Sequence, residues 1–329
     1  MWDKRRVALP DGWSTLRPTL DDLPAILDLM RASDIAATGE AETGEDDVKA
    51  ALTSPHVDPA RDCWLAYAPD GQLGGWAYID NENGGDREFV EVFVHPDHGA
   101  PSRRPLLDML LHRVAERAAE RGSAEVVAKA GALPTEIDYI ADIKAAGFQF
   151  EKRYARMRRS LDGVTPAPLP AGVTIRLVDP DDDEDLRLFH RVYDTGFRDA
   201  HDYQPRDYDS WRAYVAGLTS VAWDEWFVAE VDGVPAGVLM SADQLLEHNE
   251  AWVKNLTVLR EFRRRGVGGA LLRHAFSVYA AKGRAQVGLG VDLTSPTKAA
   301  NVYLTAGMSA IYEADIFQQR VKALATRSS

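Results

Sequence analysis

The feature of this 329-residue sequence that most constrains its fold is an internal repeat with nearly constant spacing. The matched landmarks are Trp64 and Trp226, Gly71 and Gly233, and Gly75 and Gly237 at 162 residues, Val94 and Val258 at 164, and Gly147 and Gly307 at 160. Agreement at one landmark would carry little weight, but agreement along the whole chain indicates a duplication. The sequence therefore predicts two copies of one structural plan.

Each copy predicts the same order of elements. A short strand and an Asp-rich turn precede an amphipathic helix, and a β-hairpin follows with its turn at Asp70-Gly71 or Asp232-Gly233. An apolar strand then leads through a loop into a long helix, expected at 106–121 and 268–282. Strands that alternate with helices place each half in the α/β class, with a mixed, mostly antiparallel central sheet flanked by helices.

The segment between the copies contains three prolines in five positions, Pro166, Pro168 and Pro170, which is typical of a semi-rigid linker. We therefore expect a first domain over residues 1–162, a linker over 163–171 and a second domain over 172–329.

Composition narrows the class of function. The chain carries 51 acidic and 38 basic residues, a net charge of −13, which argues against nucleic acid and anionic membranes as partners. Its one cysteine, Cys63, excludes an intramolecular disulfide and favours a reducing compartment. No apolar run approaches the ~20 residues of a membrane span, and the charged N-terminus lacks a signal-peptide core. We expect a cytoplasmic protein, a monomer or homodimer, without a metal.

The positive charges are concentrated in one place. Arg260, Arg263, Arg264 and Arg265 lie between an apolar strand and a helix whose start contains Gly266, Gly268 and Gly269. Glycine permits close approach of a ligand, and the free amides and dipole of a helix start favour an anion. The pattern predicts a diphosphate cradle; the alternative is a glycine-weakened helix start beside a solvated basic turn. The spacing fits neither a Walker loop nor the dinucleotide fingerprint.

The motif Arg263-x-x-Gly266-x-Gly268 resembles the acetyl-CoA signature of the GNAT superfamily of N-acetyltransferases. A second resemblance follows the strand expected at 287–292, where residues 295–308 are similar to the late helix of that superfamily, which ends in Leu-Tyr-x-x-x-Gly-Phe. Val302 and Met308 replace the leucine and the phenylalanine, and Ser295 replaces a common asparagine. The resemblance covers the second half of the chain and implies two tandem GNAT-like domains.

The resemblance implies a role for each matched position, with acetyl-CoA as cosubstrate. The residues implied in holding it are Thr257, Val258, Arg263, Arg264, Arg265, Gly266, Val267, Gly268 and Gly269. The backbone amide of Leu256 would polarise the thioester carbonyl, and Tyr303 would protonate the departing thiolate. Alternatively, Tyr303 packs against the cosubstrate without transferring a proton.

The general base is not assigned by the resemblance. Related enzymes commonly carry a glutamate eleven or nine residues before the first motif position, where this chain has Trp252 and Lys254. Glu250 lies on the same face of that strand by period-two alternation. It is a candidate base, but a surface salt bridge or a water chain would explain the pattern equally well.

The acceptor site is expected near residues 197–211 and 243–250. Aromatic and acidic side chains there suggest an entrance that attracts a cationic amine, although the acids also fit a solvated loop. The residues considered are Phe197, Asp199, His201, Asp202, Tyr203, Asp207, Tyr208 and Asp243.

The first copy lacks both chemical elements. Ser102, Arg104 and Pro105 stand opposite the three glycines, and Ile143 stands opposite Tyr303. We therefore expect a degenerate GNAT-like domain without catalytic function; the alternative is a weak second CoA site that uses Arg103 and Arg104.

The resulting prediction is an acetyl-CoA-dependent N-acetyltransferase that acts on a small-molecule amine by direct attack in a ternary complex. The tandem arrangement also resembles that of the mycothiol synthases, which implies acetylation of a cysteinyl amine as an alternative. A non-catalytic acyl-CoA-binding sensor is the third possibility, since no base is evident.

Overall fold

The computed structural model describes residues 8–41, 43–81, 85–200, 203, 205–218, 220–294 and 299–324. The chain forms two compact units. Unit 1 comprises Met1–Lys152 and Ala314–Ser329, and unit 2 comprises Arg153–Glu313.

Unit 1 contains β1 (Ser14–Leu16), α1 (Leu23–Thr38), α2 (Glu45–Thr53), α3 (Pro59–Asp62), β2 (Cys63–Tyr67), β3 (Leu73–Asp80), β4 (Arg87–Val94), α4 (Ala100–Glu120), β5 (Glu125–Ala132) and α5 (Ile137–Ala145). Unit 2 contains β7 (Val173–Leu177), α6 (Asp183–Phe197), α7 (Tyr208–Ala216), β8 (Phe227–Val231), β9 (Val234–Ala242), β10 (Glu250–Val258), α8 (Val267–Ala281), β11 (Gln286–Asp292) and α9 (Ala300–Thr305). Two long strands, β6 (Gln149–Ser160) and β12 (Ser309–Lys322), pass from one unit into the other.

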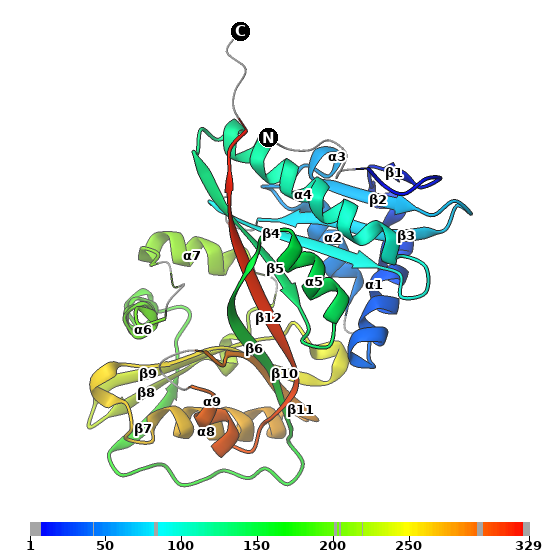
Figure 1. The fold of residues 1–329 in the computed structure, drawn as a ribbon. Helices are drawn as coiled ribbons and strands as arrows, with labels where there is room; N and C mark the ends of the chain where they lie inside the picture. The colour runs from blue at the N-terminus through cyan, green and yellow to red at the C-terminus, as the bar shows by residue number, and fades with distance from the viewer. Residues whose placement is uncertain are drawn as a thin grey trace. The chain divides into compact units, whose positions relative to one another are not determined.

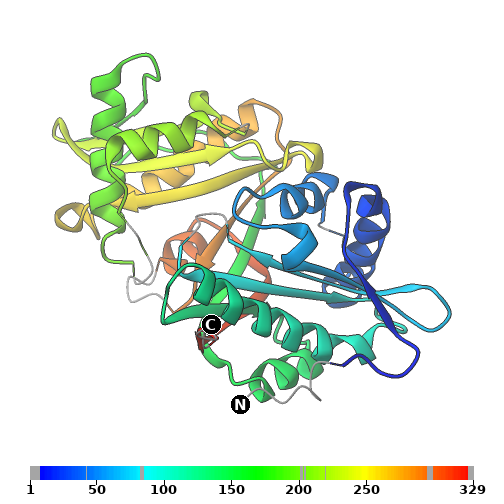
Figure 2. The same ribbon diagram turned by 90° about the horizontal axis from the view of Figure 1, so that it is seen from above.

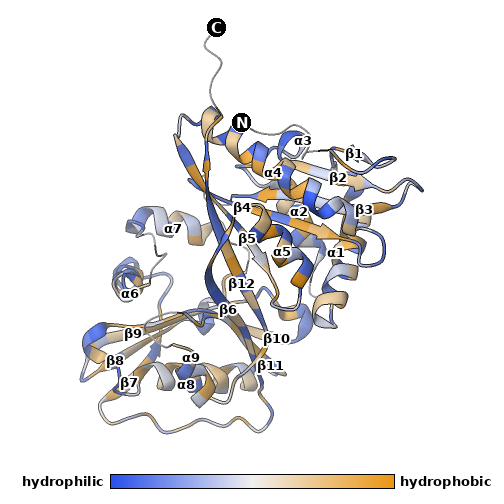
Figure 3. Cartoon of the chain, viewed as in Figure 1, coloured by the Kyte–Doolittle hydropathy of each residue, from blue (hydrophilic) through white to orange (hydrophobic). Residues whose placement is uncertain are grey.

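Unit 1 is a three-layer α/β structure. Its strands follow the order β1-β2-β3-β4-β5-β12, and among the described pairings β4–β5 is parallel and the others are antiparallel. Helices α1 and α2 cover one face, and α4 and α5 cover the other (Figure 2). Along β4 every second side chain is buried. Figure 3 shows both hydrophilic and hydrophobic residues along α4.

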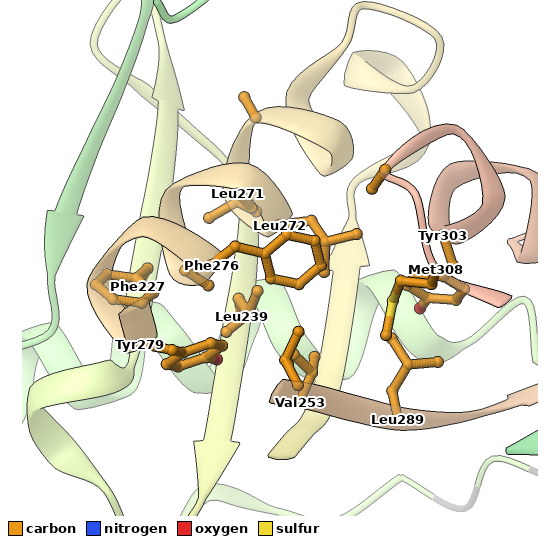
Figure 4. Close-up of a cluster of buried hydrophobic side chains, with 14 of the residues drawn as sticks. Phe227, Leu239, Val253, Leu271, Leu272, Phe276, Tyr279, Leu289, Tyr303 and Met308 are labelled. Atoms are coloured by element: carbon orange, nitrogen blue, oxygen red, sulfur yellow. The ribbon is translucent and has the colours of Figure 1, made fainter. Parts of the chain in front are cut away.

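Unit 2 repeats this plan, with strands in the order β6-β11-β10-β9-β8-β7. In the part that the structure describes, β10–β11 is parallel and the other pairs are antiparallel. Helix α8 lies on one face over a core of Leu239, Val253 and Phe276, while α6 and α7 pack on the other around Phe189 and Trp226 (Figure 4 shows the α8 side). The mixed, mostly antiparallel sheets expected from the sequence are confirmed.

The two copies exchange their last strands. From Asp315 to Lys322, β12 pairs with β5 of unit 1, and from Tyr154 to Ser160, β6 pairs with β11 of unit 2 (Figure 1). The side chains follow the backbone, because Phe317 is buried in the unit 1 core and Met157 in the unit 2 core. From the sequence we expected the first domain to end at 162 and the second to begin at 172. In the structure, residues 153–162 belong to the unit of the second copy, and residues 314–329 belong to the unit of the first.

Local predictions can be checked element by element. The Asp232-Gly233 turn joins β8 to β9 directly with φ of 51° and 80°, as a tight hairpin requires. The helix expected at 268–282 is α8, Val267–Ala281. The helix expected from 106 begins earlier, at Ala100, because Pro101 fits the first turn and the helix continues through Pro105. The proline-rich segment 164–170 forms neither helix nor strand, as expected for a linker.

Candidate active site

The site is organised by the separation of two central strands. β10 and β11 pair in parallel only from Glu250 to Trp252. Beyond Trp252, β10 continues beside β9 as far as Val258, while β11 continues beside β6 as far as Asp292. We call the separated stretches, 253–258 of β10 and 289–292 of β11, the splay. One backbone edge of β10 therefore faces the splay without a parallel partner from β11.

The direction of the β10 amides follows from one hydrogen bond. The backbone N–H of Leu259 donates to the carbonyl of Ala236 at 2.8 Å, and so points toward β9. Because successive amides alternate along a strand, those of Leu256 and Val258 point the opposite way, into the splay. This is the orientation that the sequence interpretation of Leu256 requires. Thr257 is buried and its side chain lies against Gly196 of α6.

The start of α8 lies beside the splay. A Cβ added to Gly268 would lie 3.4 Å from Val258, 3.8 Å from Leu256 and about 4.0 Å from Val302 of α9. The missing side chain therefore keeps open the space between the end of β10, the start of α8 and α9.

The same helix start presents unpaired amides. Gly266 is the N-cap with φ of 81°, a conformation that favours glycine, and no side chain caps the helix. The first helical hydrogen bond runs from the N–H of Ala270 to the carbonyl of Gly266, at 2.9 Å. The amides of Val267, Gly268 and Gly269 precede that bond, so they are the helix donors available to an anion.

The arginines before α8 divide into two pairs. Arg263 donates to the carbonyls of Val258 (2.9 Å) and Gly196 (3.2 Å) and to Asp199 (2.5 Å). Arg260 donates to the same carboxylate at 2.6 Å. The side chains of Arg260 and Arg263 therefore hold the turn before α8 in place. The backbone of Arg263 remains a separate candidate for binding the cosubstrate. Asp199 is occupied by them and is not free to attract an amine.

Arg264 and Arg265 are exposed at the turn. Arg265 lies 3.9 Å from the exposed Asp232, a weak contact, and Arg264 adopts a left-handed φ of 63°. Sequence reasoning missed a further cation, Arg273, whose Nη1 would lie 3.1 Å from a Cβ on Gly269. The signal was available, because Arg273 follows Gly269 by one helical turn on the same face.

Tyr303 is placed by α9 next to the splay. It is 7% exposed and packs in the unit 2 core, where Figure 4 shows it on the same side as Met308 and Leu289 of β11. Burial raises the pKa of its hydroxyl to about 12. Tyr303 is therefore protonated at neutral pH, as a proton donor must be.

Glu250 is fully buried at the start of β10, where its carboxylate is surrounded by donors. Arg156 of β6 donates to it at 2.5 Å, Arg158 lies 3.0 Å away, and Gln286 donates at 3.3 Å. A carboxylate that balances two guanidinium groups leaves them uncompensated when it accepts a proton. This environment is that of a structural ion pair, and the candidate role of Glu250 as a base gains no support from it.

The acidic side chains of the expected acceptor entrance are engaged locally. Asp207 caps α7 by accepting from the Ser210 amide at 2.8 Å, and Asp243 accepts from Arg284 at 3.2 Å. Tyr203 donates to Asp194 at 3.0 Å, and Tyr208 donates to Asp183 at 2.6 Å. Phe197 packs against Tyr203 with ring centroids 5.7 Å apart, while His201 and Asp202 lie outside the described residues.

Unit 1 has the same separation of strands without the cradle. β4 and β5 pair only from Arg87 to Phe89. The hydroxyl of Ser102 donates to the Gly99 carbonyl at 2.7 Å and fills the space beside Gly75 at the start of α4. Ile143, opposite Tyr303, is fully buried.

Two other features of unit 1 bear on chemistry. Burial, with smaller contributions from Asp80 and Glu136, raises the pKa of Glu91 on β4 to about 8. Burial also raises the pKa of the Cys63 thiol to about 12, which disfavours the thiolate that a nucleophile needs. Among the described residues, no three His, Cys, Asp or Glu side chains are grouped as a metal site would require. In the same part of the chain, no helix has the length and apolar character needed to cross a membrane.

Comparison with known proteins adds independent information. Residues 186–308 match the model of the acetyltransferase (GNAT) family. A mycothiol acetyltransferase from Salinispora arenicola (strain CNS-205) is 30% identical over 181 residues, 54% of this chain, and the match spans about half of that relative, 55% of its length.

Solved structures support the tandem fold over nearly the whole chain. A GCN5-related N-acetyltransferase from Sphaerobacter thermophilus aligns with a TM-score of 0.82 and 22% identity, covering 98% of this chain and 100% of that one. A tandem GNAT protein from the clavulanic acid biosynthesis pathway aligns with a TM-score of 0.66 and 17% identity, covering 95% and 100%. At these identities the similarity concerns the fold.

Proposed function

Because residues 186–308 match the model of the GNAT acetyltransferase family, we propose that this chain is an acetyl-CoA-dependent N-acetyltransferase whose acceptor is the amine of a small molecule. The observation that carries the proposal is the surroundings of Gly268, whose own amide is one of the free donors at the start of α8. A Cβ at Gly268 would lie within van der Waals distance of β10 in the splay and of α9, the helix that bears Tyr303. Family members use acyl-CoA donors.

The residues present suit a diphosphate and a thioester arm. The amides of Val267, Gly268 and Gly269 would hold the diphosphate, with Arg264, Arg265 and Arg273 supplying positive charge. The splay edge of β10 would pair with the amide groups of the pantetheine arm. The donor supplies an activated acetyl group as a thioester.

The chain's own groups would then act at two atoms. The Leu256 amide would donate a hydrogen bond to the thioester carbonyl oxygen as negative charge develops there, an effect of about 3 kcal/mol for one donor. Tyr303 would donate its proton to the departing sulfur as the carbon–sulfur bond breaks and the nitrogen–carbon bond forms. The acceptor amine attacks in its neutral form and loses its second proton to water, and water returns a proton to the Tyr303 phenolate.

The N-terminal copy is proposed to be a scaffold without a CoA site. The occupied helix start at Ser102 and the buried Ile143 support this proposal. Titration calorimetry with acetyl-CoA should give one equivalent bound per chain. Two equivalents would contradict the proposal and favour a second site in unit 1.

Mycothiol synthesis is a specific version of the same function. It is favoured by the 30% identity with a mycothiol acetyltransferase, although the match covers about half of each chain. The test uses the deacetylated form of mycothiol, which carries the free cysteinyl amine. Its acetylation at least about tenfold faster than that of other amines would support this acceptor.

The activity itself is tested by release of free thiol from acetyl-CoA in the presence of an amine panel, with the acetylated product identified by mass spectrometry. Thiol release that depends on an amine supports the proposal. Tight acetyl-CoA binding without release by any amine would contradict it and favour an acyl-CoA sensor.

A further inference from the structure

The N-terminal copy has a separation of strands that the proposed function leaves unused. β4 and β5 pair in parallel as far as Phe89 and Lys129 and then diverge, because β4 continues beside β3 and β5 beside β12. We call residues 90–94 of β4 and 130–132 of β5 the unit 1 splay. Since Ser102 fills the start of α4, this splay has no diphosphate cradle beside it.

Glu91 brings a carboxylate to the unit 1 splay. It precedes Phe93 by two residues and therefore shares its face of the sheet, which packs with α1 and α2. Gly131 stands at the equivalent place on β5, two residues beyond the last pair. A Cβ added to Gly131 would meet only Ile316, at 3.7 Å, among the described atoms within 4 Å. The side of the splay next to Glu91 therefore keeps space for a small ligand.

The Glu91 carboxylate is only partly exposed and lies among other acids. Burial raises its pKa to about 8, and Asp80 and Glu136 contribute to the rise through their negative charge. No ion pair in the described part of unit 1 involves Glu91. A cation placed beside this carboxylate would stabilise its charged form.

Cations that flank the unit 1 splay are paired with other acids. Lys129 shares the face of Phe89 by register and donates to Glu151 at 2.9 Å. Arg103 of α4 lies 3.9 Å from Asp142 of α5. The chain therefore supplies these charges to other carboxylates.

A buried hydroxyl lies at the same splay. Tyr139 of α5 is 6% exposed, and its hydroxyl forms no hydrogen bond within the part of the chain that the structure describes. Burial raises the pKa of that hydroxyl, Glu91 adds to the rise and the backbone amide of Val92 opposes it, so the three groups lie close together. The Val92 amide points into the splay by strand alternation, since the N–H of His95 donates to Gly74 of β3 at 2.9 Å. A ligand that donates a hydrogen bond to the Tyr139 oxygen would offset the cost of burying it.

Aromatic rings line the face that carries Glu91. Tyr78 of β3 stands opposite Glu91 in the strand register and stacks on Trp76 with ring centroids 4.4 Å apart. Phe93 lies 6.4 Å from both rings, and the side chains of Tyr78 and Phe93 are partly exposed. An alkylammonium suits such a surface, because aromatic faces attract cations and bury carbon chains.

From this arrangement we infer that unit 1 binds a small primary amine in its ammonium form, with Glu91 as the counter-charge, Tyr139 as a hydrogen-bond acceptor and the rings of Tyr78 and Phe93 against its carbon chain. The inference goes beyond the proposed function, because it assigns a ligand to the copy that is proposed to have no cosubstrate site. The ammonium and the carboxylate would form a charge-assisted hydrogen bond. This site would hold the amine without acetylating it.

The test uses two probes that differ in charge. n-Propylammonium and the neutral n-propanol have the same carbon chain, and each is titrated into the full chain labelled with meta-fluorotyrosine, at constant ionic strength and about pH 8.5. Above its pKa of about 8 the Glu91 carboxylate is ionised, while the alkylammonium keeps its proton. Fluorine NMR follows the tyrosines, and the Tyr78→Phe and Tyr139→Phe variants identify two resonances by their loss.

Two variants separate the carboxylate from a general effect of charge. Glu91→Gln removes the charge and keeps the shape of the side chain, whereas Asp28→Asn removes a charge at an exposed position of α1. The resonances of Tyr78 and Tyr139 should shift saturably with n-propylammonium. The dissociation constant should rise at least about tenfold in Glu91→Gln and should not change in Asp28→Asn. n-Propanol should cause no saturable shift.

Three outcomes would overturn the inference. One is an equal dissociation constant in the wild type and in Glu91→Gln. Another is equal shifts with the two probes, which would indicate an apolar site without a charge preference. The third is saturable shifts confined to tyrosines of unit 2, which would leave the acetyltransferase proposal intact.

Discussion

Among single residues, the arginines before α8 show what the sequence conceals. Four arginines in six positions predict an anion site, and the prediction treats them alike. In the structure, Arg260 and Arg263 are tied to Asp199, and Arg264 and Arg265 remain exposed. Their partner is more than 60 residues away in sequence, so no local pattern distinguishes the two pairs. The same long-range pairing, of Glu250 with Arg156 and Arg158, separates a candidate base from a structural carboxylate.

Tyr303 can be tested by removal of its hydroxyl alone. Tyr303→Phe should lower kcat by about a hundredfold, since positioned proton transfer contributes on that order. The dissociation constant for acetyl-CoA should stay within about threefold, because the ring remains in the core. Stopped-assay turnover and calorimetry measure the two quantities separately. Unchanged turnover would remove Tyr303 from the chemistry and leave it a packing residue.

Glu250 should matter for stability. Glu250→Gln removes the counter-charge of the buried Arg156, so the free energy of unfolding should fall by about 3 kcal/mol. Urea unfolding measures this, with the exposed Glu247→Gln as control. A free energy of unfolding for Glu250→Gln equal to that of the wild type, together with a wild-type kcat that falls at low pH, would instead identify Glu250 as the base.

Glu91 makes the stability of unit 1 depend on pH. Its folded pKa of about 8 lies above the ordinary 4.5, so the folded state holds a proton that the unfolded state has released. Stability should therefore decrease as pH rises from about 4.5 to 8. Glu91→Gln should remove this dependence and raise the free energy of unfolding at pH 8.5 by at least about 1 kcal/mol, with little change at pH 5. Calorimetric melts at pH 5 and pH 8.5 measure the effect, and Asp28→Asn, at an exposed position, is the control. An identical pH dependence of stability in the wild type and in Glu91→Gln would contradict the prediction.

At the scale of elements, periodicity predicts most of what is observed. Hairpins, the long helices and the paired central strands follow from alternation and turn residues, because these signals are local. The separation of β10 from β11 and the shift of register at Lys254 of β10 depend on which strand each edge meets, and they were not predicted. The sequence left open whether the acids near residues 197–211 form an acceptor entrance or a solvated loop. Charge counts show only that acids are present, and tertiary contacts show which of the described ones arginines and helix caps bind.

The start of α8 gives a prediction at this scale. Gly268→Ala places a methyl group toward Val258, Leu256 and Val302, in the space proposed for the cosubstrate. Acetyl-CoA affinity should fall at least about tenfold, while the unfolding midpoint should change little, because the nearest neighbour of the added Cβ lies at an ordinary 3.4 Å. Calorimetry and a thermal melt of the same sample provide the two readouts. Undiminished affinity would place the cosubstrate elsewhere.

At the scale of the whole molecule, the repeat predicted two copies of one fold, and the structure has two such copies. The repeat did not predict that β6 and β12 would each pair with the sheet of the other copy. The repeat matches the two copies in chain order, and nothing in that order tells which sheet a strand will join. The consequence is that a cut in the linker does not separate the two compact units.

This can be tested with fragments. A fragment of residues 153–313 contains all strands of unit 2 and should melt cooperatively and bind acetyl-CoA. A fragment of residues 172–329 lacks β6, with Met157 and Leu161 of the unit 2 core, and should melt at a lower temperature with weaker binding. Equal stability and affinity of the two fragments would contradict the importance of the exchanged strand.

The exchange also sets an order for biosynthesis. Domains usually fold in the order in which the ribosome releases them. Here β5 emerges early but its partner β12 follows the 161 residues of Arg153–Glu313, a delay on the order of ten seconds at usual translation rates. During that interval the second copy can complete its sheet while the first keeps an open edge, so the first copy to be translated is the last to finish folding and the one that needs protection from aggregation.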